Sequence, residues 1–152
     1  MVTLAIWHQD IMDFLYIHHK LIVPELRSAD LHHCVSIPDI FIKHVVEDGV
    51  WTTFSPKDAE VFLGKKLNEI YGDEFESVYI ACETNLQNTK TFKARELFFE
   101  INKLQCTTGE PFIFFIDNAN KKSNQMNLGT VTTTNLCTEI IKCTNSISVC
   151  NL

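Results

Sequence analysis

The sequence lacks a long apolar run and a basic amino-terminal region. Asp10 and Asp13 interrupt its first hydrophobic stretch, so we expect neither a signal peptide nor a membrane span there. The 13 Lys and Arg residues are outnumbered by 19 Asp and Glu residues, which gives a net charge of -6. That balance disfavours a non-specific surface for nucleic acid or anionic lipid. We therefore expect a cytoplasmic protein with no nucleic-acid or membrane partner, in which any phosphate site is local.

Metal-binding and disulfide-rich spacings are also missing. Six cysteines are present, but no two form a C-x-x-C pair, and no Asn-x-Ser/Thr sequon occurs. Zinc sites need clustered ligands, and the side chains of the adjacent pairs His18-His19 and His32-His33 should point in divergent directions. We therefore expect surface or core-edge histidines rather than metal ligands. The cysteines should be reduced thiols, of which one or two carry chemistry.

Linkers, internal repeats and low-complexity tracts are absent as well. The 152 residues, 45% of them hydrophobic, should therefore form one domain with its own core. Three short apolar runs are typical of strands: residues 2–7, 34–37 and 51–54. Residues at helical spacing follow the first run, and Pro38-Asp39 opens a helix that should stop near Gly49. Ser55 is a turn or helix-cap residue.

The second half of the chain continues this alternation of strands and helices. The clearest helix is predicted over residues 92–106, because its apolar residues form one stripe and Gly109 follows. Residues 112–116 are all large and apolar, as in a strand buried on both faces of a parallel sheet. Residues 58–72 are ambiguous, and the polar run 117–127 predicts a long loop. The pattern is that of an α/β protein.

The stretch GTVTTTNLCTEI, residues 129–140, carries the candidate chemistry. It is rich in β-branched residues and should be extended. Side chains alternate in an extended chain, so Asn135, Cys137 and Glu139 should share one face within about 14 Å. On spacing alone, however, an inert small cysteine flanked by polar residues on a solvated strand explains the pattern equally well.

The wider sequence strongly resembles the large, catalytic subunit of class I ribonucleoside-diphosphate reductases. Three blocks in order carry the resemblance: KKSNQMNLGT (121–130), NLCTEI (135–140) and SVCNL (148–152). Five further blocks extend it over nearly the whole chain: LAIWHQDIMDFL (4–15), SIPDIF (36–41), YGDEFESVY (71–79), KARELFFEI (93–101) and TGEPFIFFID (108–117). The chain is therefore expected to be one partial domain, residues 1–152, of that subunit's barrel.

The resemblance implies a fold and a set of roles. The family has a ten-stranded α/β barrel with a central finger loop, whose tip presents a cysteine that forms a thiyl radical and abstracts the substrate's 3′ hydrogen. Matched by motif, that cysteine is Cys137. Asn135 would hold the ribose hydroxyls, and Glu139 would be the general base toward the 3′-hydroxyl. Cys150 matches one member of the redox pair that reduces the 2′ position and becomes a disulfide.

The same resemblance implies partners and cofactors. The substrate would be a ribonucleoside diphosphate, and a metal-containing small subunit would supply the radical to a homodimer of large subunits. Thioredoxin or glutaredoxin would restore the thiols. No cofactor would bind this segment itself, because the ATP and dNTP effector sites lie outside it in the family.

Two departures from the family pattern predict weaker packing. His32, His33 and Ser36 are polar where the family has an aromatic-rich strand, and Glu100 lies beside the apolar stripe of its helix where a small residue is usual.

Two other function classes remain to be compared with the reductase. One is a non-catalytic relic or interaction module derived from the same subunit, which flanking stop codons would favour. The other is an unrelated thiol-dependent hydrolase. That class is disfavoured because no histidine follows His44 and no nucleophile motif surrounds Cys137.

Overall fold

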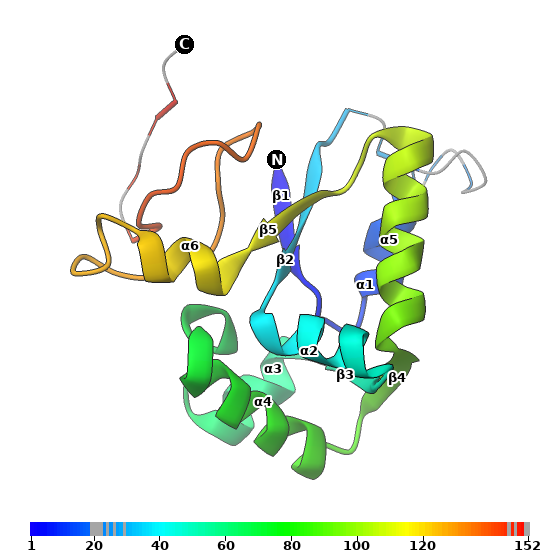
Figure 1. Cartoon of the computed structure of the whole chain (residues 1–152), viewed down its shortest axis with the longest axis vertical. Coiled ribbons are helices and arrows are strands. Elements are labelled where there is room, and N and C mark those ends of the chain that lie inside the picture. Colours follow the sequence, from blue (N-terminus) through cyan, green and yellow to red (C-terminus); the bar gives the residue numbers. More distant parts are fainter. Residues whose placement is uncertain are drawn as a thin grey trace.

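The computed structural model describes residues 1–18, 23, 25, 27–28, 30–145, 147 and 149–150. Its centre is a parallel sheet of three strands, β1 (Val2–Ala5), β2 (His33–Ile37) and β5 (Phe112–Phe115), in the order β1-β2-β5 (Figure 1). In the register of the sheet, Cys34 pairs with Thr3 on one side and with Phe112 on the other. The predicted strands at the start of the chain, at 34–37 and at 112–115 are confirmed, as is the parallel arrangement. The prediction that residues 112–116 are buried on both faces is wrong, because β5 lies at the edge of the sheet and only Phe114 of the strand is buried.

A second, antiparallel sheet pairs β3 (Val50–Phe54) with β4 (Thr89–Lys93). The sequence predicted β3 but not β4. The strand TKTFK has a single large apolar residue and is mostly exposed, so it lacks the apolar run that marks a strand. Its antiparallel pairing with β3 stabilises it as a strand, although its own sequence does not predict one.

Around the sheets, the described part of the chain forms the helices α1 (Ile11–Tyr16), α2 (Asp39–Glu47), α3 (Pro56–Leu63), α4 (Gly72–Asn85), α5 (Ala94–Thr108) and α6 (Ile116–Lys122), and the short 3-10 helix η2 (Leu67–Glu69). The predicted stripe of α5 is buried at Ala94, Leu97, Ile101 and Leu104, and Gly109 ends the helix in the left-handed conformation. The Ser55 hydroxyl caps α3 by accepting from the Asp58 amide at 3.5 Å. None of the described helices is both long enough and apolar enough to span a membrane.

The prediction of a loop over residues 117–127 is wrong for its first half, which forms α6. Ile116, Ala119 and Asn120 are buried there, so packing against the sheet stabilises a helix that its polar sequence does not indicate. Helix α4 was also missed. Its buried residues are Phe75, Tyr79 and Cys82, but other apolar residues lie between and beside them, so no single apolar stripe marks the helix.

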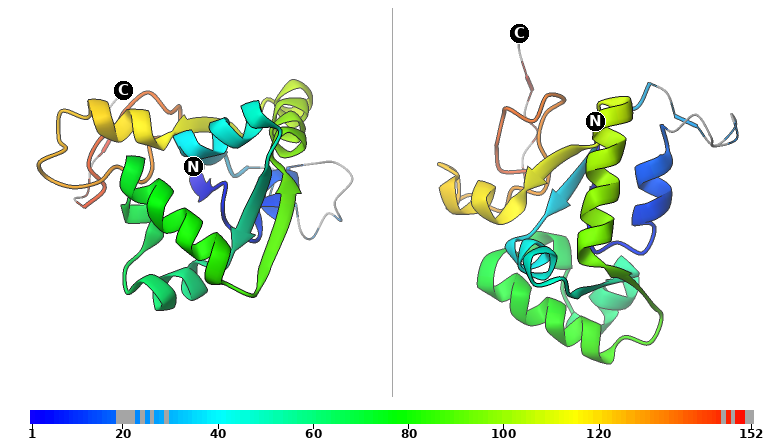
Figure 2. Two further views of the ribbon diagram at one scale, coloured as in Figure 1. Left: turned by 60° about the horizontal axis from the view of Figure 1, so that its bottom comes forward. Right: turned by 45° about the vertical axis from the view of Figure 1, so that its right-hand side comes forward.

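The two faces of the parallel sheet are covered differently. Val35 and Ile37 of β2 belong to a large apolar core shared with α1, α2, α4 and α5. Cys34 of β2 and Phe114 of β5 point to the other face, where they pack with Val131. Figure 2 shows the same division from two directions, with α1 and α5 on one side and α6 and the chain that follows it on the other.

The described residues form no closed barrel. The parallel strands make an open sheet with β1 and β5 at its edges, and Phe115 on the β5 edge is 44% exposed. The fold is α/β as expected, while the ten-stranded barrel is not completed within this chain.

An aromatic stack joins the antiparallel sheet to α4. The rings of Trp51 and Tyr79 lie 4.2 Å apart at an interplanar angle of 9°. The Tyr79 hydroxyl accepts from the Thr52 amide and donates to the Thr52 carbonyl, both at 2.9 Å. Burial raises the pKa of Tyr79, so the phenol stays neutral and can do both.

We expect Tyr79→Phe to lower the free energy of unfolding by about 1–3 kcal/mol, because it leaves a buried amide and a buried carbonyl of Thr52 without their partner. Urea denaturation measures the change. The matched control is Tyr71→Phe at a half-buried residue before α4, which should shift stability by less than about 0.5 kcal/mol. Equal effects of the two substitutions would contradict this account of the stack.

Candidate active site

Residues 129–135 run over the face of the parallel sheet that lies opposite the helical core. The Asn120 side chain of α6 holds this segment, since Nδ2 donates to the Val131 carbonyl at 2.9 Å and Oδ1 accepts from the Val131 amide at 2.8 Å. Val131 is fully buried, and the hydroxyls of Thr3 on β1 and Thr133 lie 2.8 Å apart. The threonine-rich segment is therefore fixed directly against β1 and β2.

The segment belongs to a loop with two arms. Thr144 joins the returning arm to the outgoing one, because its amide and its hydroxyl both donate to the Thr130 carbonyl, at 3.3 and 2.9 Å. The Thr132 and Thr144 hydroxyls are a further 3.0 Å apart. Gly129 permits this closure, since a Cβ there would lie 2.9 Å from the Cys143 sulfur.

The tip of the loop is a turn centred on residues 135–138. The Thr138 amide donates to the Asn135 carbonyl at 3.2 Å, and the Ile140 amide donates to Asn135 Oδ1 at 2.9 Å. Thr138 has φ 64, so the chain cannot continue as a strand. The prediction of an extended chain through residue 140 is therefore wrong beyond Asn135. An asparagine side chain that bonds its own following backbone competes with extended structure.

This turn separates the four candidate residues into different surroundings. Asn135 and Cys150 come together, with Nδ2 3.6 Å from the sulfur, and both line a cavity of ≈ 300 Å³. Glu139 instead lines a groove formed with β5 and α6. Cys137 is exposed at the turn and does not line the Asn135 cavity. The shared face expected for Asn135, Cys137 and Glu139 is absent among the described residues, because the turn breaks the alternation.

The six cysteines are all free thiols but differ in environment. Cys34, Cys82 and Cys143 are buried, while Cys106, Cys137 and Cys150 are exposed. Burial raises the pKa of Cys34 to about 12, and it also raises the pKa of Cys82. Cys34 and Cys82 therefore stay protonated and inert at neutral pH. Cys137 and Cys150 are both exposed, so their environment is compatible with the reactive roles expected from the sequence.

A second cavity, of ≈ 290 Å³, lies at the carboxyl ends of β1 and β2. Ala5, His8 and Ser36 line it together with Thr132 and Thr133 of the loop. In parallel α/β sheets, ligands bind at the carboxyl ends of the strands. The sequence analysis did not single out these two threonines, although their place just before Asn135 could have indicated them.

The expectation that His32 and His33 point apart is wrong. Both Nδ1 atoms contact the Glu110 carboxylate, that of His33 at 2.7 Å. His33 is the first residue of β2 and His32 precedes the strand, so strand alternation does not apply to this pair. The partner lies 77 residues away, and no local pattern could have revealed it. His19 lies outside the described residues.

The comparisons with known proteins agree with this architecture. The family model of the ribonucleotide reductase barrel domain matches residues 1–152. The chain belongs to the ribonucleotide reductase barrel-domain family. It is 43% identical over 148 residues to the ribonucleoside-diphosphate reductase large chain 2 of Saccharomyces cerevisiae, covering 96% of this chain and 16% of that protein. The resemblance found in the sequence motifs is thereby confirmed.

Further relatives come from other lineages. The large chain of Neurospora crassa is 40% identical over 153 residues, which is 99% of this chain and 16% of that protein. The large subunit of vaccinia virus is 41% identical over 153 residues, which is 99% of this chain and 19% of that protein. The chain thus spans less than a fifth of the length of these relatives.

The environment of each cysteine in this reductase segment leads to a labelling prediction. We expect iodoacetamide at pH 7.5 to modify Cys106, Cys137 and Cys150 in the native protein. The three buried cysteines should stay unmodified until denaturant is added, since the reagent needs an accessible thiolate. Peptide mass spectrometry measures the modification of each site. Native labelling of Cys34 at the rate of Cys137 would contradict the packing of the loop on the sheet.

Proposed function

We propose that this chain is part of the catalytic barrel of a class I reductase large subunit, and that the subunit reduces ribonucleoside diphosphates to deoxyribonucleoside diphosphates. The observation that carries the proposal is the position of Cys137. It lies at the tip of a two-armed loop on the sheet face opposite the helices, and the family places its radical cysteine on such a finger loop.

The sheet supports a barrel in the complete subunit. Helices α1, α2, α4 and α5 pack on one face of the sheet, and α6 and the loop cover the other, which leaves the loop on the face that would be the inside of an α/β barrel. The edges of β1 and β5 are where further parallel strands would pair. The single partial domain of residues 1–152 would then supply part of the ring of ten strands.

The chemistry assigns a different task to each side chain. A thiyl radical on Cys137 takes the hydrogen atom from C3′ of the ribose and becomes a thiol, and the atom returns to C3′ at the end of the cycle. Glu139 accepts the 3′-hydroxyl proton, and Asn135 bonds the ribose hydroxyls as donor and acceptor. The 2′-hydroxyl takes up a proton and leaves as water, and a hydrogen replaces it at C2′. The two electrons and two protons for this reduction come from Cys150 and a second thiol, which together become a disulfide.

The cavity shared by Asn135 and Cys150 supports the roles of these two residues beyond the motif match. The role of Cys137 rests on the motif and on its place at the loop tip, and the role of Glu139 rests on the motif alone. The remaining parts of the proposal also come from the family. They are a small subunit that supplies the radical, a homodimer of large subunits, thioredoxin or glutaredoxin as reductant, effector sites outside this segment, and a cytoplasmic location.

The test is product analysis with the complete large subunit that carries this segment, combined with its small subunit. Cys137→Ser should yield no deoxynucleotide, because no other side chain here exchanges the hydrogen atom. Cys150→Ser should still activate the substrate but release free base, since the reducing equivalents are missing. Glu139→Gln should slow turnover about 10²–10⁴-fold by removing the proton acceptor.

Cys106→Ser is the matched control, because Cys106 is an exposed thiol on α5 away from the loop. It should leave deoxynucleotide formation unchanged. Deoxynucleotide from Cys137→Ser, or normal turnover of Cys150→Ser, would overturn the assignment. Complete inactivity of the unsubstituted subunit would instead favour a non-catalytic relic.

A further inference from the structure

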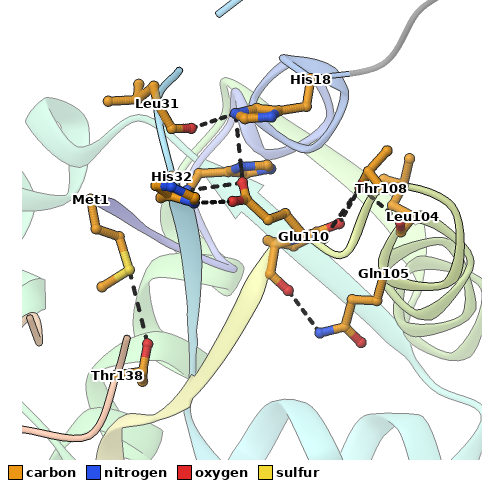
Figure 3. A network of polar contacts seen from close by, with 11 residues as sticks. Met1, His18, Leu31, His32, Leu104, Gln105, Thr108, Glu110 and Thr138 are labelled. Carbon is orange, nitrogen blue, oxygen red and sulfur yellow. Dashed lines mark hydrogen bonds and ion pairs between the residues drawn. The ribbon is translucent and has the colours of Figure 1, made fainter. Parts of the chain in front are cut away.

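Glu110 lies at the meeting point of three segments outside the loop. It is 8% exposed, between the end of α5 and the start of β5. His18 reaches it from the end of α1, and His32 and His33 reach it from the start of β2. Figure 3 shows the Glu110 carboxylate directed between the imidazoles of His18 and His32. The proposed reaction uses none of these groups.

The spacing of the ligand atoms suits a metal ion. Glu110 Oε2 lies 2.7 Å from His33 Nδ1 and 3.6 Å from His18 Nε2. One ligand atom from each of His18, His33 and Glu110 falls within 4.8 Å of the others. Ligands at about 2.0–2.1 Å from a tetrahedral Zn²⁺ are separated by about 3.4 Å. The rings of His18 and His33 are stacked with their centroids 4.6 Å apart, so both rings would have to turn for their nitrogen atoms to meet on one ion.

A buried polar atom is also left over. His33 Nε2 is buried and has no hydrogen-bond partner among the described residues, and the whole residue is 1% exposed. An orphaned polar atom costs about 1–3 kcal/mol. Nδ1 donates to the Glu110 carboxylate, so Nε2 is the unprotonated nitrogen of the ring and would receive the proton if Nδ1 bound a metal.

We propose that His18, His33 and Glu110 form a site for a divalent transition metal of the Zn²⁺ type. Two imidazoles and one carboxylate are the donor set of zinc sites with an open fourth position, and no cysteine takes part. His32 is a positioning residue that holds the second carboxylate oxygen. A bound ion would tie the end of α1 to the starts of β2 and β5.

His18 has one competing contact, because its Nε2 lies against the Leu31 carbonyl oxygen. A carbonyl oxygen accepts, so Nε2 carries the proton in this arrangement. Metal binding at Nε2 moves that proton to Nδ1 and breaks the Leu31 contact. Binding at His33 Nδ1 has a similar cost, because it moves the ring proton to Nε2 and replaces the 2.7 Å hydrogen bond to Glu110.

Co²⁺ titration of the chelator-treated, reduced chain tests the proposal. The three exposed cysteines are first replaced by serine, so that thiolates cannot supply the ligands. One equivalent of Co²⁺ should give a visible d–d absorption without a thiolate charge-transfer band, and Zn²⁺ should displace it. Zn²⁺ should also raise the melting temperature.

The variants are chosen to separate binding from folding. Glu110→Gln and His18→Gln should each weaken Co²⁺ affinity at least about 10-fold. Loss of a residue that only supports a metal ligand already weakens metal affinity by about 10–100-fold. His18 is half-buried at a helix end, so its variant decides the question if Glu110→Gln does not fold. His44→Gln is the matched control, because His44 packs on Trp51 with ring centroids 5.7 Å apart, away from the cluster, and it should bind normally.

Two results would overturn the site. The absence of any one-equivalent Co²⁺ absorption would mean that the cluster is a hydrogen-bonded network only. Unchanged Co²⁺ affinity in the His18→Gln variant would mean that the ion binds elsewhere. Neither outcome depends on reductase activity.

Discussion

Strand β2 is buried along its whole length and bonded to a parallel neighbour at both edges. None of its five side chains is exposed to solvent, so each needs an apolar or a hydrogen-bonding partner on the face to which it points. Val35 and Ile37 meet the helical core. His33 meets Glu110, without which a buried imidazole would cost about 1–3 kcal/mol. The position of the chain after α5 is therefore coupled to a residue on the central strand.

The other face of β2 determines where the candidate site lies. Cys34 and Ser36 are small, so residues 129–135 can approach the sheet closely and bury Val131 against it. Asn120 of α6 then supplies the hydrogen bonds that a neighbouring strand would have made to Val131. The loop begins from this anchored stretch, and its tip carries Cys137 away from the sheet. Packing on β2 thus determines the direction from which the proposed radical cysteine is presented.

Strands and helices whose own residues form an apolar run or an apolar stripe could be predicted from the sequence. The apolar runs of β2 and β5 and the stripe of α5 belong to this group. Strand β4, helix α4 and helix α6 could not, because partners distant in sequence stabilise them. The turn at Asn135 was missed for a different reason. A side-chain bond to the following backbone outweighed the strand preference of its β-branched neighbours.

The residues that depart from the family pattern also have partners that the sequence could not reveal. His32, His33 and Glu100 were expected to weaken packing, yet each has a polar partner. Glu110 receives the two histidines, and the Tyr16 hydroxyl donates to Glu100. These pairs join residues 77 to 84 positions apart, so only the folded chain reveals them. The family and the identity of the candidate cysteines, by contrast, followed from short local motifs.

The most direct test of the account follows the hydrogen atom itself. The complete large subunit carrying this segment, with its small subunit, is given a ribonucleoside diphosphate that is deuterated at C3′. If Cys137 abstracts and returns that atom, turnover should be slower than with the undeuterated substrate, and most of the deoxynucleotide should still carry deuterium at C3′. Turnover at the same rate with both substrates, or product whose C3′ hydrogen comes entirely from solvent, would contradict the central role given to Cys137.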